Sequence, residues 1–206
     1  MAKEHTAALT SKILALILFV LLVGLFAKFG QPGFLAITGA QVTSLGNTSV
    51  TLAGTVSINL DDSSASFGAG FVNVSFTQAN ISTDGGRAGW VNTSGLNFTD
   101  PMHILNNGTA PANVTLYATN SSALFIGGTG PAQNFRAAND EASSCGGTLT
   151  SAWTNLSLVE YIICSNLGYI DASDTLLVYF NLTIPNDAPA GVKTNSITFT
   201  ARLATQ

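Results

Sequence analysis

Two patterns of hydrophobic residues divide the chain. Residues 13–30 are almost continuously apolar, and no polar side chain occurs from Ile13 to Ala27. From Gln41 onward, hydrophobic and polar residues alternate with a period of two, and clusters of turn-forming residues separate the alternating runs. The first pattern indicates a membrane-directed helix, and the second indicates strands with one face on a core. We therefore expect a basic region at 1–12, a signal or transmembrane helix at 13–30, a linker or donated strand at 31–48, and a β-sandwich at 49–206.

The alternating part predicts an all-β fold with almost no helix. Its length and turn spacing fit one Ig-like antiparallel β-sandwich of about 8–10 strands. Because 186–191 is rich in Asn, Asp, Pro and Gly, we expect a turn there that joins the last two strands as a hairpin. The clearest strands are expected at 49–60, 67–76, 101–105, 113–118, 156–164, 174–185 and 193–203, with edge strands at 123–126 and 134–137.

The apolar segment predicts export. Its 15 uninterrupted residues lie between the length of a signal-peptide core and the roughly 17 residues that a spanning helix needs. A cleaved signal and a retained membrane anchor therefore both stay open. Lys3 and Lys12 precede the apolar run, so the rest of the chain is expected outside the cell, at its surface, and in contact with the membrane if the helix is kept.

The chain is rich in Asn-x-Ser/Thr sequons, which are acceptors for N-glycosylation. It contains ten, whereas chance placement of its Asn, Ser and Thr residues predicts about 3.5. Glycans would also supply the hydration that few charged residues provide here. We expect glycosylation among Asn47, Asn73, Asn80, Asn92, Asn97, Asn107, Asn113, Asn120, Asn155 and Asn181.

Cys145 and Cys164 are the only cysteines, and both follow the apolar segment. An exported chain with two cysteines is expected to join them in a disulfide, because its compartment is oxidising. The spacing does not match a CxxC metal or redox motif.

Charge and composition exclude several functions. Seven Lys and Arg stand against eleven Asp and Glu, for a net charge of −4, so the chain has no basic surface for nucleic acid. Its two histidines, His5 and His103, leave little material for a metal or triad site. We expect a protein that is not an enzyme and needs no cofactor, with His103 at the surface or hydrogen-bonded.

Two further groups of residues have a functional and a structural interpretation. Carboxylates occur at Asp61-Asp62, at Asp140-Glu141, and at Asp171 with Asp174. Calcium takes such ligands, but none of these groups completes a calcium-loop pattern, so solvated turns are expected and Ca²⁺ is the alternative. Trp90 and Trp153 are expected in the core, with a sugar-stacking platform as the alternative.

The closing segment at 180–201 contains Ile-Pro, then Ala-Pro-Ala-Gly, then a Thr-rich strand. It resembles the last hairpin of prokaryotic exported Ig-like sandwiches, and 105–117, with Asn-Asn-Gly-Thr, resembles a turn and strand of the same domains. The whole layout is similar to subunits of archaeal extracellular filaments and surface layers. That resemblance implies assembly either by donation of an N-terminal strand or, as in pilins, by a retained core helix, although no pilin processing site precedes Ile13.

We therefore expect a non-enzymatic, glycosylated structural protein of the cell surface that assembles with copies of itself. Donation of the segment at about 37–45 to a neighbouring subunit is the expected mechanism, because an added strand covers exposed sheet edges. The alternatives are a membrane-anchored module that binds sugars or a protein, and a pilin-like subunit that keeps its helix.

Overall fold

The computed structural model describes residues 54–95 and 99–204, which belong to one compact unit, Leu52–Gln206. The predicted helix at 13–30, the segment at 31–48 and the sequons at Asn47 and Asn97 lie outside the described residues. Within the described ranges, no helix has the length and hydropathy needed to cross a membrane.

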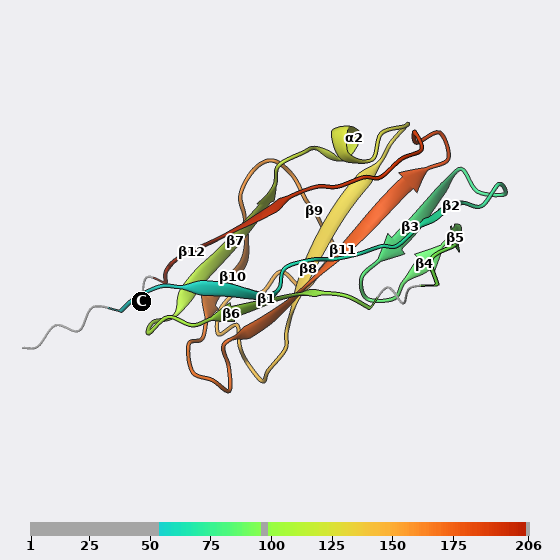
Figure 1. Cartoon of the computed structure of the whole chain (residues 1–206). Helices are drawn as coiled ribbons and strands as arrows, with labels where there is room; N and C mark the ends of the chain where they lie inside the picture. The colour runs from blue at the N-terminus through green and yellow to red at the C-terminus, as the bar shows by residue number, and fades with distance from the viewer. Residues whose placement is uncertain (1–53, 96–98, 205–206) are drawn as a thin grey trace, which may run out of the picture. The chain divides into compact units, whose positions relative to one another are not determined.

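The described residues form an all-β fold of antiparallel sheets (Figure 1). The strands are β1 (Ile58–Asp62), β2 (Gly70–Val72), β3 (Gln78–Ser82), β4 (Arg87–Ala88), β5 (Trp90–Asn92), β6 (Met102–Asn106), β7 (Ala112–Ala118), β8 (Ala132–Asn139), β9 (Thr154–Asn155), β10 (Tyr161–Leu167), β11 (Thr175–Pro185) and β12 (Ile197–Leu203).

One predicted strand is wrong. Residues 123–126 were expected as an edge strand, but Ser122–Phe125 form the short helix α2. The Ser121 side chain caps this helix by accepting a hydrogen bond from the Leu124 N–H. Ser is a favoured N-cap residue because its oxygen satisfies an otherwise unpaired N–H of the first turn.

The larger sheet has seven strands and is organised around β11. One edge of β11 pairs with β8 along most of its length, and the other pairs with β6 over Thr175–Val178 and with β3 over Asn181–Pro185. β1 continues the sheet beyond β6, β4 continues it beyond β3, and β9 pairs with β8. The length of β11 suits this central place, because each of its edges has a partner.

The smaller sheets are β10-β7-β12, with β7 in the middle, and the pair β2-β5. The main hydrophobic core joins the three-stranded sheet to the inner face of the seven-stranded sheet. Val114 and Leu116 of β7 pack there with Ile104, Leu176 and Val178 of the larger sheet. Two sheets around one core are compatible with a β-sandwich.

The predicted hairpin of the last two strands is wrong, although both strands exist. β11 lies in the seven-stranded sheet, whereas β12 pairs with β7 in the other sheet. The turn residues at 186–191 therefore begin a crossing between sheets. Alternation shows which face of a strand is buried but not which strand lies beside it, and this explains the error.

The predicted disulfide is confirmed, with 5.8 Å between the Cα atoms of Cys145 and Cys164. It ties the loop that follows β8 to β10, where isolated bridges join Cys145 to Leu167 and Leu149 to Cys164. The cross-link therefore covers the outer edge of β10.

The two main sheets differ in extent. Figure 1 shows β7, β10 and β12 toward one end of β8 and β11, and β3 with β4 toward the other. Of the part of the chain that the structure describes, the three-stranded sheet therefore covers only part of the inner face of the larger sheet.

Candidate functional site

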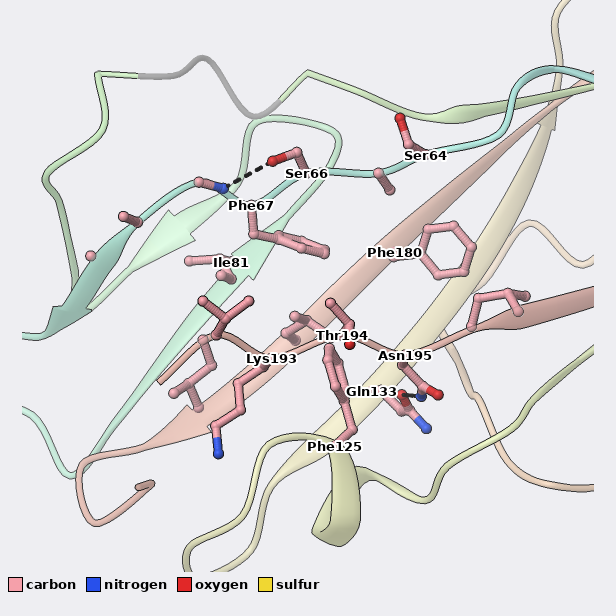
Figure 2. Close-up of a pocket in the computed structure, with 18 of the residues that line it drawn as sticks. Ser64, Ser66, Phe67, Ile81, Phe125, Gln133, Phe180, Lys193, Thr194 and Asn195 are labelled. Atoms are coloured by element: carbon pink, nitrogen blue, oxygen red, sulfur yellow. Dashed lines mark hydrogen bonds between the residues drawn. The ribbon is translucent and has the colours of Figure 1, made fainter. Parts of the chain in front are cut away.

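An apolar groove lies over this uncovered part, with a volume of about 820 Å³. Its floor comes from β3, β8 and β11 and includes Ile81, Phe180 and Leu182. One wall is the segment 63–70, which contributes Phe67, and the other is the segment 191–195, with Phe125 of α2 beside it (Figure 2). Ile81 and Leu182 belong to a small second hydrophobic cluster, against which Phe67, Trp90 and Phe125 pack only partly buried.

The Asn195 side chain holds the wall at 191–195, because its amide both accepts from and donates to one backbone residue, as a paired strand residue does. The Asn195 amide accepts a hydrogen bond from the Asn120 N–H at 3.0 Å and donates to the Asn120 carbonyl at 3.0 Å. Asn195 also donates to Gln133 at 2.9 Å, and Gln133, which is buried, donates to the same Asn120 carbonyl. These bonds fix the wall without giving it a neighbouring strand.

The loop before this wall is also anchored. The Asp187 carboxylate accepts hydrogen bonds from the side chain of Thr129 at 2.7 Å and from its backbone N–H at 2.9 Å, and these bonds lower the pKa of Asp187. In contrast, Val192 is 95% exposed at the groove rim. Val192 therefore adds exposed apolar surface to the rim of the groove.

Within residues 54–95 and 99–204, one edge of β12 has no strand beside it, and this edge continues the wall. Ser196 accepts from the Thr119 N–H, and the Ala204 N–H donates to Pro111. With the antiparallel register between β12 and β7, these bonds direct the even-numbered residues of β12 toward β7. The N–H and C=O groups of Ile197, Phe199 and Ala201 point the other way, and no described residue bonds to them.

Half-buried hydrophobic side chains line the same side of both sheets. Ile197, Phe199 and Ala201 of β12 pack against the main core but stay partly exposed. The same holds for Ile58 and Leu60 of β1, which is an edge of the larger sheet. The open edge, these side chains and the groove together define what we call the β12 side.

The two tryptophans have different environments. Trp90 is half-buried in the groove, where its ring lies against Gly70. The expectation that both are core residues is wrong for Trp153, which is 41% exposed. The Arg136 guanidinium lies 5.2 Å from the Trp153 ring centroid and 4.4 Å from that of Tyr179. These three side chains form a platform on the outer face of the larger sheet, and cation–π attraction holds it together.

Arg136 also forms an ion pair with Asp84 at 3.2 Å. Burial raises the pKa of Asp84, but hydrogen bonds from Ser82, the Gly86 N–H and Arg136 outweigh it, so the pKa is lowered. The platform therefore includes a fixed cation with its counter-ion.

The carboxylates considered as calcium ligands lie in two places. Asp61 and Asp62 are in β1 and accept hydrogen bonds from Asn59 and Ser64. The Glu141 carboxylate accepts from the Asp174 N–H at 2.9 Å. Among the residues with described positions, no three His, Cys, Asp or Glu side chains gather as metal ligands. His103 lies at the surface, with its Nδ1 3.8 Å from Asp140.

Eight of the ten sequon asparagines are described. Asn80, Asn155 and Asn181 are in β3, β9 and β11 of the larger sheet, and Asn113 is in β7. Asn73 and Asn92 begin turns in which the oxygen of each accepts from the serine two residues later. Asn107 and Asn120 lie between strands.

No family model, curated protein or solved structure matches this chain in the three comparisons made. The groove was not predicted from the sequence, because its floor and walls come from segments more than a hundred residues apart. The one available signal was Val192 within a turn-rich segment, and it did not distinguish a groove rim from an ordinary loop.

Proposed function

We propose that this chain is an exported structural protein of the cell surface, an Ig-like β-sandwich whose copies assemble into an extracellular filament or surface layer. Copies join when a strand from one subunit is added to β12 of the next. The observation that carries this proposal is the coincidence of an unpaired strand edge with an apolar groove on the β12 side.

An added strand fits this surface better than a small apolar ligand. A ligand could fill the groove, but it would leave the backbone groups of Ile197, Phe199 and Ala201 without partners. A strand bonds to those groups and places alternate side chains on the groove floor. It also removes an open edge, which otherwise invites uncontrolled aggregation.

The segment at 31–48 has the composition of such a strand. It contains no charged residue, and its hydrophobic residues include Ile37, Val42 and Leu45. An uncharged segment can enter an apolar groove without the large desolvation cost of an ionised side chain. We therefore assign donation to this segment, centred on 37–45, in a second copy of the chain.

A matched pair of proline variants tests the proposal. Ala201→Pro removes an N–H that faces the open edge, whereas Thr200→Pro removes one that faces β7. Proline is tolerated on a strand edge but breaks a ladder between paired strands. Ala201→Pro is expected to keep the melting temperature of the full-length protein and lose assembly, while Thr200→Pro destabilises the fold itself.

Assembly is measured on the full-length protein by electron microscopy and sedimentation. If Ala201→Pro forms filaments or sheets as abundantly as the wild type, strand addition at β12 is wrong. N-terminal sequencing of protein taken from the cell surface tests the pilin-like alternative, in which the helix at 13–30 is kept.

A second candidate is a surface-anchored module that binds sugars. The exposed ring of Trp153 beside Arg136 and Tyr179 favours it, because aromatic faces pack against sugar rings. Binding of the unglycosylated protein to a glycan array, lost in Trp153→Ala, would support this candidate. Equal binding by that variant would remove it.

A further inference from the structure

Two sequon asparagines flank the platform on one face of the larger sheet. Asn155 of β9 and Asn181 of β11 both pair with Asn134 of β8, from opposite sides. From Thr175 to Thr183 of β11, the even-numbered residues are buried and the odd-numbered ones are not, so Asn181 is on the outer face. Residues paired across strands share a face, and this places Asn155 there too, two strand spacings or about 10 Å away.

The platform occupies the neighbouring row of the same face. Arg136 pairs with Tyr179, next to the pair of Asn134 with Asn181. Trp153 precedes Asn155 by two residues, as Tyr179 precedes Asn181. Because strand side chains repeat their direction every two residues, each asparagine has an aromatic ring beside it on its own face. Figure 1 shows β8 beside β11 in the larger sheet.

This spacing is enriched in the chain. Four of the ten sequons have an aromatic residue two positions before the asparagine, namely those with Phe71, Trp90, Trp153 and Tyr179. Aromatic residues are 9% of the sequence, so about one such case is expected by chance. Only the Trp153 and Tyr179 rings also meet at one cation.

The amide nitrogens of these two asparagines are available. No described residue bonds to the side chain of Asn155 or Asn181. In contrast, Asn106 and Asn195, which are not in sequons, donate hydrogen bonds from Nδ2 to protein oxygens. Asn113 differs again, because it lies half-buried in β7 and its Oδ1 atom is buried without a hydrogen-bond partner.

We propose that Asn155 and Asn181 are N-glycosylation sites whose first sugars pack on the Trp153–Arg136–Tyr179 platform. The donor class is an oligosaccharide linked to a polyprenyl phosphate. The Nδ2–C1 bond forms, the bond between C1 and the phosphate oxygen breaks, the polyprenyl phosphate leaves, and the amide proton passes to solvent. The apolar face of each sugar ring covers an aromatic ring that is otherwise exposed.

This inference rests on the export in the proposed function, and it deepens the assembly model. A sugar layer on the outer face of the larger sheet excludes that face from tight contacts between subunits. The β12 side does not include this outer face, so it stays available for strand addition.

The test uses the full chain secreted by cells that N-glycosylate, with glycopeptides mapped by mass spectrometry. Asn155 and Asn181 are expected to be modified and Asn113 bare. Wild type is then compared with Asn155→Gln, Trp153→Ala and the double variant. The glycan is expected to raise the melting temperature by about 2–4 °C when Trp153 is present and not when it is absent.

Asn107 provides the matched control, since Leu105 precedes it by two residues and it lies in a turn. The melting-temperature changes of Asn107→Gln and Trp153→Ala are expected to add. In Trp153→Phe, the Asn155 glycan is still expected to raise the melting temperature. If Asn107 is glycosylated but Asn155 and Asn181 are not, this inference is wrong and the proposed export stands. The same holds if the melting-temperature changes of Asn155→Gln and Trp153→Ala simply add. A chain kept inside the cell with every sequon bare would overturn the proposed export and this inference together.

Discussion

The side-chain amide of Asn106 holds two turns of this fold together. It is fully buried at the end of β6, and its Nδ2 donates to the carbonyls of Ala110, Leu167 and Gly168. Its Oδ1 accepts from the Gly108 N–H at 3.1 Å. One amide therefore joins the turn before β7 to the end of β10.

Removal of this amide is expected to cost stability. Asn106→Ala leaves buried carbonyls without donors, and the free energy of unfolding should fall by about 1–3 kcal/mol. In Asn106→Asp the free energy of unfolding should fall at least as far, because a carboxylate cannot donate to those carbonyls. Urea unfolding measures both, and the exposed neighbour in Asn107→Ala serves as control with a change within about 0.5 kcal/mol.

Asp174 is a residue whose charge opposes folding. Burial raises the pKa of Asp174, a hydrogen bond from Thr175 lowers it, and the nearby charges of Glu141 and Asp171 raise it further, so the net direction is up. The folded state thus binds this proton more tightly than the unfolded chain does. The resulting penalty is present above the folded pKa and disappears as the pH falls below the ordinary value of 3.8.

Asp174→Asn should therefore stabilise the protein at pH 7, since the amide oxygen can still accept from Thr175. The advantage should shrink as the pH falls toward about 4. Thermal unfolding of both proteins across this pH range measures the effect. A constant difference at every pH would show that the charge of Asp174 is not its cause.

Among the elements, the loop after β8 depends most on a covalent constraint. The disulfide joins residues 19 positions apart and holds this loop along β10. Closing a loop of that length contributes roughly 3 kcal/mol through the entropy of the unfolded chain. The Cys145→Ala, Cys164→Ala double variant is expected to lose about this much in urea unfolding. Wild type measured with reductant should match it, while the variant should not respond to reductant.

At the scale of the whole molecule, the groove predicts that an added strand stabilises the fold. A synthetic peptide of residues 31–48 should bind the protein and raise its melting temperature with peptide concentration, because binding favours the folded state. The stabilisation should reach about 2.7 kcal/mol at a hundredfold excess over Kd. Ala201→Pro should bind the peptide weakly, and a scrambled peptide is the control for nonspecific contact.

The positions of strands and faces were largely predictable from the sequence. Five residues were expected on one face of a strand, namely Leu176, Val178, Phe180, Leu182 and Ile184. The first four are buried, and Ile184 is half-buried. β3 was missed, because Gln78–Ser82 has only one large hydrophobic residue, Ile81. Helix α2 was missed because four residues are too few for a helical period.

By itself, the sequence determined the all-β class, the disulfide and the face that β11 buries from Leu176 to Leu182. These follow from local alternation and from the presence of only two cysteines. The tertiary structure alone decided that β11 and β12 lie in different sheets and that Trp153, Arg136 and Tyr179 meet. It also decided that β12 pairs with β7 alone among the strands described. Each of these depends on pairing between distant segments, and a period of two describes the direction of a side chain without naming its neighbour.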